Sequence, residues 1–378
     1  GSLDTLKVGV ATLTPDLLTG WAVVHPVRDH VPMNGELFFK NYHLPLIKDQ
    51  KLFAKDGIAR FKGDIQKLVL TLDTDLKGEQ VPEGQYTALM DTDLTHQLNI
   101  REFNGQLMGG TANLLGSVNW HDHVSWDLKG RLERLDPKDK TVPQIAQDFL
   151  PPNLDANLSS TGSLQKGLVV NAQLAFDKYE TWAVKLNQDE EKDNKPQPML
   201  LDISWKGIDR AMPYIGWLSS EEGHTNLTLK EGQQDIYVST TIRPHEQALL
   251  PTGKYDARLD VKGDLLNVEN FRYEAEKGSL TGQAKVKLPT EKQQLSWQAQ
   301  LKAQDFNPQT IAAAAPINLL NGEIKASGFA KPNQQIIQLE QIDLKGQLPQ
   351  ENKTETLALK GKSTAALIFN DEKAGGGF

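Results

Sequence analysis

The sequence predicts a mainly β protein, a long sheet of many mostly antiparallel strands with one apolar face and only a few short helices. Three observations predict this fold. Apolar and polar residues alternate along most of the chain, and a period of two places alternate side chains on opposite faces of a strand. A long segment of the chain recurs further on, and helical periodicity is confined to short stretches.

The alternation is clearest between residues 98 and 133, where it predicts strands near 98–107, 111–120 and 124–133. Gly109-Gly110 would form the first hairpin turn, because glycines adopt positive φ without strain. His121-Asp122-His123 would form the second turn. At one strand and turn per ~8–12 residues, the whole chain would hold roughly twenty to thirty strands.

The recurring segment begins at a Pro-x-Gly-x-Tyr motif. Pro82 to Tyr86 returns as Pro251 to Tyr255, an offset of 251 − 82 = 169 residues, and Gly110 and Trp126 have later counterparts in Gly278 and Trp297. Internal repeats of this kind stack one structural unit beside the next. We therefore expect an entry segment (1–81), a first β repeat (82–250) with an exposed loop at 187–198, and a second, truncated repeat (251–378), all in one continuous groove.

Helices are expected in only three places. Residues 141–150 and 310–320 follow the Asp136-Pro137 and Asn307-Pro308 pairs, and 208–218 is a third, irregular candidate.

Composition excludes several classes of protein. The net charge of −8 argues against a broad nucleic-acid surface, which needs an excess of Lys and Arg. Cysteine is absent, so there is no disulfide framework and no thiolate site. No apolar run reaches the length of a transmembrane helix. Gly1-Ser2 resembles the remnant of a cleavage site, and we expect a fragment from the interior or the C-terminal side of a longer protein.

Candidate chemistry is sparse. His121-x-His123 could ligate a metal, but a solvated turn is favoured because the matching turn at 289–294 has no histidine. Asp73 with Asp75, and Asp91 with Asp93, could pair as catalytic carboxylates, although a wet sheet surface is the commoner explanation. No nucleophile elbow, P-loop or dinucleotide fingerprint occurs. We predict no enzyme activity, no metal site and no cofactor.

The apolar face has two interpretations. It could be ordinary core packed against another layer, or a groove that holds apolar ligands. Only 38% of residues are hydrophobic and few helices are available to cover a face this long, which favours a groove, since an uncovered apolar face would promote aggregation. The predicted lining is Ala112, Leu114, Val118, Trp120, Val124, Trp126, Leu128 and Leu132, with Ala284, Val286, Leu288, Leu295, Trp297, Ala299 and Leu301 in the second copy.

The frame Phe-x-Gly-x-Leu-x-Gly-Gly-x-Ala-x-Leu-x-Gly-x-Val-x-Trp at 103–120, with Val-x-Trp-x-Leu-x-Gly-x-Leu at 124–132, resembles the TamB family of the AsmA-like superfamily. That resemblance implies a U-shaped sheet, the β-taco, with a hydrophobic concave groove. It also implies a periplasmic protein anchored in the bacterial inner membrane, phospholipid as the ligand, and the outer-membrane β-barrel TamA as a partner in the translocation and assembly module.

Two functions follow. The preferred one is a bridge-like lipid transfer component, linked to outer-membrane biogenesis, which carries phospholipid acyl chains along the groove between the two membranes. The alternative is a structural or chaperone-like β scaffold, which would assist outer-membrane or autotransporter protein assembly by pairing an exposed edge strand with its substrate.

Overall fold

The computed structural model describes residues 4–12, 17–44, 52–78, 81–163, 165, 167–176, 179–189, 197–212, 216–248, 250–289, 294–311, 313–331, 334–349 and 354–368. The chain divides into two compact units, Gly1–Gln197 (unit 1) and Pro198–Phe378 (unit 2). The segments predicted at 1–81, 82–250 and 251–378 stay a prediction.

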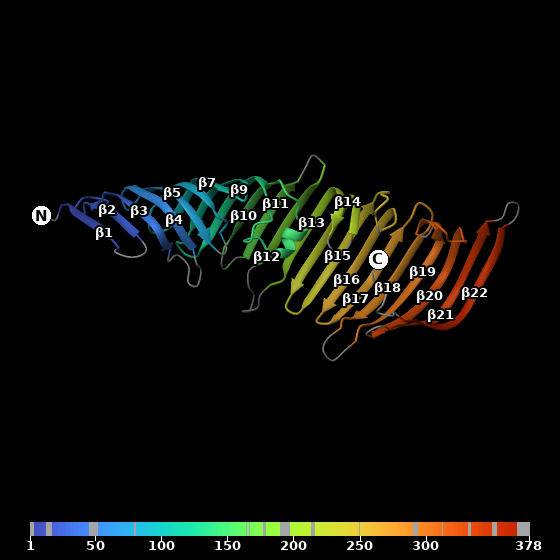
Figure 1. The fold of residues 1–378 in the computed structure, drawn as a ribbon. Coiled ribbons are helices and arrows are strands. Elements are labelled where there is room, and N and C mark those ends of the chain that lie inside the picture. Colours follow the sequence, from blue (N-terminus) through green and yellow to red (C-terminus); the bar gives the residue numbers. More distant parts are fainter. Residues whose placement is uncertain are drawn as a thin grey trace. The chain divides into compact units, whose positions relative to one another are not determined.

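Unit 1 is an antiparallel meander in which each described strand pairs with its neighbours in sequence (Figure 1). Its strands are β1 (Leu6–Ala11), β2 (Leu17–Val24), β3 (Met33–Leu44), β4 (Leu52–Gly63), β5 (Leu68–Gly78), β6 (Gly84–Thr92), β7 (Gln97–Leu107), β8 (Gly110–Asn119), β9 (Ser125–Leu135), β10 (Leu154–Ser163), β11 (Gly167–Ala175) and β12 (Thr181–Asp189). One helix, α1 (Gln144–Phe149), lies between β9 and β10.

Unit 2 is a meander of the same kind. Its strands are β13 (Met199–Met212), β14 (Gly216–Lys230), β15 (Gln233–Ile242), β16 (Gly253–Lys262), β17 (Leu265–Glu274), β18 (Ser279–Lys287), β19 (Ser296–Phe306), β20 (Leu319–Lys331), β21 (Gln334–Pro349) and β22 (Thr354–Ile368). A single turn of 3₁₀ helix, η1 (Pro308–Thr310), follows β19. The predicted mainly antiparallel β fold is confirmed.

Of the three expected helices, one is present and two are wrong. The helix expected at 141–150 is present as α1. The one expected at 310–320 is wrong, because only η1 forms there and β20 already begins at Leu319. The one expected at 208–218 is also wrong. Ile208 and Leu218 are buried positions of β13 and β14, so their spacing arose from two consecutive antiparallel strands.

The first predicted hairpin is one residue out of place. β7 ends at Leu107 and β8 begins at Gly110, so Met108 and Gly109 form the turn, with φ of 51° and 75°. Gly110 serves a different purpose. A Cβ there would stand 2.2 Å from the Glu133 carbonyl, and at Gly278 it would stand 2.1 Å from the Asp305 carbonyl. Glycine therefore allows the next strand end to approach closely at both positions.

Part of the predicted loop at 187–198 lies outside the described residues. Its start, up to Asp189, belongs to β12, because the alternation of that strand continues into the polar run.

Candidate functional site

The most extensive feature of unit 1 is a sheet face without charge. The strand register places side chains in four rows that run across the strands, because directly paired residues share a face. We call these rows the apolar face of unit 1. They contain no Asp, Glu, Lys, Arg or His.

The rows of unit 1 are as follows. The first is Leu18, Phe39, Gly57, Thr74, Tyr86, Gly105, Ala112, Leu132, Ala156, Leu174 and Trp182; the second is Val10, Gly20, Leu37, Ala59, Leu72, Ala88, Phe103, Leu114, Gly130, Leu158, Ala172 and Val184; the third is Val8, Ala22, Gly35, Phe61, Leu70, Met90, Ile100, Gly116, Leu128, Ser160, Val170 and Leu186; the fourth is Leu6, Val24, Met33, Gly63, Leu68, Thr92, Leu98, Val118, Trp126, Gly162, Leu168 and Gln188.

Unit 2 has the same charge-free arrangement, which we call the apolar face of unit 2. Its rows are Trp205, Gly223, Thr240, Tyr255, Tyr273, Leu280, Ala303, Gly322, Leu344 and Leu359; Ile203, Thr225, Val238, Ala257, Phe271, Gly282, Leu301, Ile324, Ile342 and Gly361; Leu201, Leu227, Ile236, Leu259, Val268, Ala284, Ala299, Ala326, Leu339 and Ser363; and Met199, Leu229, Gln234, Val261, Leu266, Val286, Trp297, Gly328 and Ile337.

Many side chains of the two faces are only half-buried, including Leu114, Trp126 and Val286. The buried apolar clusters lie at one end of the strands, although Leu68 and Thr92 in the fourth row of unit 1 are buried too. In unit 1 a cluster forms around Leu135 and Phe176, and in unit 2 the matching cluster forms around Tyr273 and Phe306. Apart from α1 and η1, the described residues hold no helix that could cover the faces. The faces therefore keep apolar surface available for contact.

Large side chains on these faces lie over glycines of the neighbouring strand. A Cβ on Gly57 would come within 2.3 Å of the Phe39 ring, one on Gly223 within 2.2 Å of Trp205, and one on Gly328 within 2.7 Å of Trp297. The ring thus rests on bare backbone and shields it from water. Because the rings lie on the neighbouring backbone, this packing limits how far they project from the sheet and keeps the face apolar.

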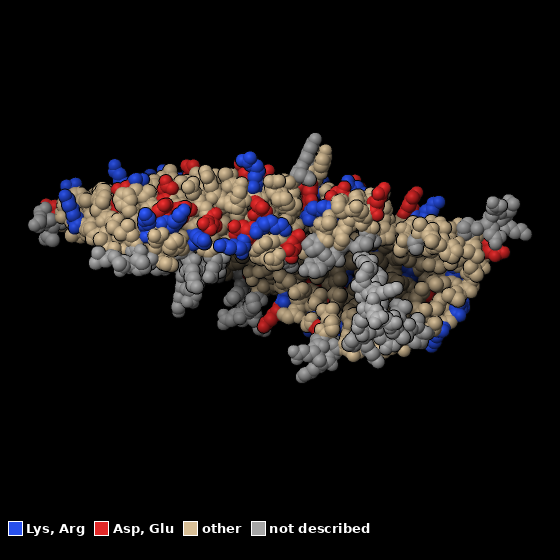
Figure 2. All heavy atoms as spheres, viewed as in Figure 1, with Lys and Arg blue, Asp and Glu red and all other residues tan. Residues whose placement is uncertain are grey.

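The opposite face of each meander is polar. In unit 1, Asp91 accepts hydrogen bonds from Arg101 Nε and, at 3.3 Å, from Asn99 Nδ2, and the bond from Arg101 holds the pKa of the Asp91 carboxyl below its usual value. Arg60 Nε donates to Glu36 Oε1 at 2.6 Å in the same way. The visible surface of strands β1–β12 accordingly carries many charged side chains in Figure 2.

Single hydrogen bonds recur in the two copies of the internal repeat. Tyr86 Oη donates to the Pro82 carbonyl at 2.6 Å, and Tyr255 Oη donates to the Pro251 carbonyl at 2.7 Å. The Asp91–Asn99 contact recurs as Asn267 Nδ2 donating to Asp260 at 3.4 Å.

The repeat also starts earlier than the sequence motif. The bulge at Ala54/Asp56 returns at Ser220/Glu222, an offset of 220 − 54 = 166 residues, and both Ala54 and Ser220 are completely buried. Phe39, Gly57 and Thr74 correspond to Trp205, Gly223 and Thr240 at the same offset. Strands β3–β12 therefore match β13–β22, so the repeat boundary coincides with the boundary between the two units.

That earlier start was missed from sequence, because Phe replaces Trp and Ala replaces Ser between the copies. A constant spacing of aromatic, glycine and threonine was the available signal.

Most predicted lining residues lie on the two apolar faces. Ala112, Leu114, Val118, Trp126, Leu128 and Leu132 stand in the rows of unit 1, and Ala284, Val286, Trp297, Ala299 and Leu301 stand in those of unit 2. Trp120 and Val124 lie instead in the turn between β8 and β9, where they are 37% and 38% exposed. Leu288 and Leu295 flank the strand ends of β18 and β19.

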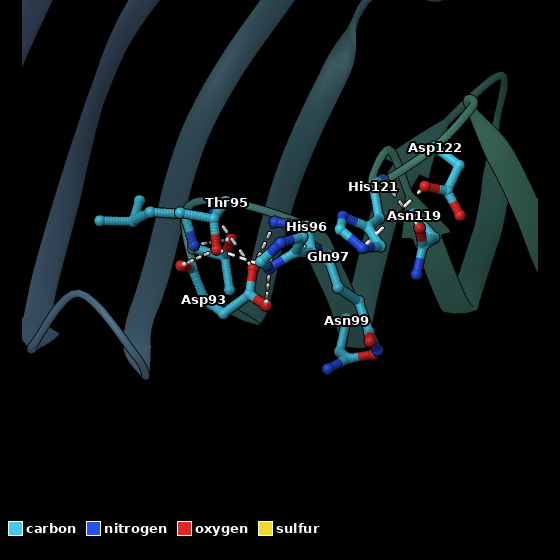
Figure 3. A network of polar contacts seen from close by, with 10 residues as sticks. Asp93, Thr95, His96, Gln97, Asn99, Asn119, His121 and Asp122 are labelled. Carbon is cyan, nitrogen blue, oxygen red and sulfur yellow. Dashed lines mark hydrogen bonds and ion pairs between the residues drawn. The ribbon is translucent and has the colours of Figure 1, made fainter.

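The predicted turn at His121 contacts a second turn, which holds His96. The sequence did not predict this contact. The rings of His96 and His121 contact edge to face, with centroids 4.3 Å apart (Figure 3). The Asp93 carboxylate accepts backbone hydrogen bonds from Thr95, His96 and Gln97, and these lower its pKa to about 2. Among the described residues no group of three or more His, Cys, Asp or Glu side chains is arranged to hold a metal ion.

The fold and the two faces define a class of protein: repetitive antiparallel meanders, each with a charge-free face whose described rows carry no Asp, Glu, Lys, Arg or His. A family model described as TamB, N-terminal domain, matches residues 1–188 and again 156–371. The chain belongs to the TamB family. No curated protein and no solved structure matches it.

The double match agrees with the repeat, since one model fits two successive stretches. The matched domain is described as N-terminal, whereas an interior or C-terminal-side fragment was expected. Membership of this family points to outer-membrane protein assembly or lipid transport in the cell envelope. In the part of the chain that the structure describes, no helix has the length and apolar character needed to cross a membrane.

Proposed function

We propose that this chain carries phospholipid acyl chains along its apolar faces, as a periplasmic component of a bridge between the inner and outer membranes. One observation supports it above all: no charged residue interrupts the rows of either face. Moving one methylene group from an apolar contact into water costs about 0.8 kcal/mol of free energy. A uniform face therefore lets a chain slide, because each methylene leaves one apolar contact for another like it.

In this proposal the acyl chains and the head groups of the lipid have different surroundings. Acyl chains would lie against the half-buried side chains of the rows, such as Leu114 and Val286, while head groups remain in water. Lipid transfer of this kind breaks no covalent bond, so it requires neither enzyme chemistry nor a cofactor. The proposal includes TamA in the outer membrane as the partner of this protein, as the family implies. It also includes an anchor in the inner membrane.

The test is lipid transfer between vesicles by the protein carrying Leu114→Asp. A carboxylate in the second row would be desolvated by a passing chain, at a cost of several kcal/mol, so we expect transfer to fall at least ten-fold. Asn113→Asp is the matched control, because the adjacent side chain is exposed on the polar face. Circular dichroism establishes that both variants stay folded. Normal transfer by Leu114→Asp would refute the assignment of the face.

A second function is favoured by the edge of unit 1. All six residues of β1 are exposed, and Leu6 and Val8 are 54% and 40% exposed. An exposed strand of this kind can pair with a substrate strand. Native mass spectrometry separates the two functions: bound phospholipid supports the conduit, whereas a lipid-free protein that binds unfolded outer-membrane protein through β1 supports the scaffold.

A further inference from the structure

A hollow of about 620 Å³ lies at one end of the strands of unit 2. It is bounded by Glu221 of β14, by the ends of β15, β16 and β17, by the connection that follows β15, and by η1. Its lining includes Ile242 and Ala275. Ile242 is almost fully buried, and Ala275 packs against the cluster around Tyr273 and Phe306. Ile242 and Ala275 continue the parity of the apolar face of unit 2, whereas Thr241, Lys254 and Glu274 pair with one another on the polar face. The hollow is therefore lined by residues of both faces at this end of the strands.

One guanidinium nitrogen in this hollow has no partner. Arg243 lines the hollow, and its Nε is buried without a hydrogen bond. Buried N–H groups in folded proteins are almost always paired, and an unpaired one that is charged is especially costly. The Asp209 carboxylate, which accepts a hydrogen bond from Trp217 and also senses the charge of Arg243, makes no hydrogen bond to this nitrogen. Among the described residues the Arg243 Nε therefore has no acceptor.

Unit 1 shows how the same position is satisfied within the protein. Leu76 pairs with Gly84 and Ile242 pairs with Gly253. Lys77 and Arg243 directly follow the first residue of each pair, and Glu83 and Thr252 directly precede the second, so we match Lys77 with Arg243 and Glu83 with Thr252. Lys77 Nζ lies 3.4 Å from Glu83 Oε2. In unit 2 threonine has replaced the acid, and the cation remains. The exchange removes that acid, and the acid that remains near Arg243 in unit 2, Asp209, makes no hydrogen bond to its Nε.

The remaining charges of the hollow come in both signs. Lys254 adds a second cation, and Glu221 and Glu276 add exposed carboxylates. Glu274 also lines the hollow but pairs with Arg272. The described residues of the lining include no Trp, Tyr or Phe. Quaternary ammonium groups are bound by aromatic faces, whereas a primary ammonium donates hydrogen bonds that carboxylates accept.

We propose that this hollow binds the head group of a phospholipid that carries a primary ammonium. Its phosphate contacts Arg243 and Lys254, its ammonium contacts Glu221 or Glu276, and its acyl chains extend onto the apolar face of unit 2. This inference rests on the proposed lipid-carrying function and gives it a lipid preference.

The test measures binding to the purified chain by isothermal titration calorimetry. The probes are dihexanoyl phosphatidylethanolamine, dihexanoyl phosphatidylcholine, O-phosphoethanolamine and inorganic phosphate. We expect the ethanolamine lipid to bind at least ten-fold more tightly than the choline lipid. Arg243→Gln should weaken its binding roughly ten-fold to a hundred-fold, the range of a charge-assisted hydrogen bond. Arg258→Gln, which removes an exposed ion pair with Glu269 outside the hollow, should leave it unchanged.

The outcomes separate the site from the function. Equal binding of the two lipids, or unchanged binding by Arg243→Gln, overturns the head-group site while the conduit stands. Phosphate that binds as tightly as O-phosphoethanolamine overturns the zwitterionic assignment. If O-phosphoethanolamine binds in an Arg243-dependent manner and the lipids bind no more tightly than it does, the site stands and the acyl-chain function falls.

Discussion

Glycines beneath aromatic rings shape the apolar faces at the scale of single residues. The Trp205 ring occupies the space that a side chain at Gly223 would need, and the same relation holds between Phe39 and Gly57. Sheets of one layer cannot bury a tryptophan between two layers, so the ring lies flat on the neighbouring backbone. Glycine is required there for space and not for an unusual φ.

Gly223→Ala should therefore destabilise the protein. The new methyl would collide with the indole 2.2 Å away, and overpacking of this kind costs about 1–3 kcal/mol. Urea unfolding followed by tryptophan fluorescence measures the change. Gly361→Ala is the matched control, because Gly361 also stands in a row of unit 2 but has open space at Cβ. An equal loss in both variants would contradict the steric explanation.

Asp93 organises the turn before β7 by accepting three backbone hydrogen bonds. Its pKa is lowered to about 2 from an ordinary 3.8. Since the folded value lies below the unfolded one, the stabilisation is present above about pH 4 and is lost as the pH falls toward 2.

Asp93→Asn should consequently lower the unfolding midpoint at pH 6 and have almost no effect near pH 2. Thermal unfolding monitored at both pH values tests this expectation. Asp122→Asn is the control in the adjacent turn, where the carboxylate side chain is 81% exposed. A destabilisation by Asp93→Asn that is the same at both pH values would show that charge is not the cause.

Repeated elements differ in sequence yet keep the same local geometry. The Pro-x-Gly-x-Tyr motif opens β6 and β16, and in each case the tyrosine hydroxyl reaches back to the proline carbonyl. Burial raises the pKa of Tyr86 to about 12 and raises that of Tyr255 as well. Each hydroxyl thus stays protonated as a donor throughout the physiological range.

Tyr86→Phe and Tyr255→Phe should each cost about 0.5–1.5 kcal/mol, the net value of one hydrogen bond. Chemical denaturation of the two variants compares them directly. Because the Tyr255 side chain also interacts with Tyr273, whereas Tyr86 stands opposite Gly105, the loss at Tyr255 should equal or exceed the loss at Tyr86. A silent substitution in one copy and a large loss in the other would show that the motifs are not equivalent.

At the scale of the whole molecule, each unit is a meander in which described strands pair with their neighbours in sequence. Stability in such repeat arrays is a sum of local terms and nearest-neighbour terms. A lesion in one strand should loosen its neighbours and leave distant strands unaffected.

Hydrogen–deuterium exchange of Gly223→Ala tests this locality. Exchange should accelerate in β13 to β15, which surround the substituted glycine in the sheet, while β6 to β9 keep wild-type rates. A uniform rise across the chain would indicate a single cooperative unit.

The sequence by itself was sufficient for the β class, the strands around residues 98–133 and the two-fold repeat. It also placed eleven of the fifteen predicted lining residues in the rows. The reason is that a period of two is local: parity along one strand decides which side chains share a face.

Only the tertiary structure decided the rest. The contact of His96 with His121 and the packing of Trp205 on Gly223 join residues of different strands, and parity says nothing about register. The false helix at 208–218 has the same origin, because spacing cannot reveal that the stretch is shared between two strands. The Nε of Arg243 is buried without a hydrogen bond among the described residues, which the order of residues along the chain does not reveal. A missing partner is a property of the surroundings of a side chain, which the folded chain creates.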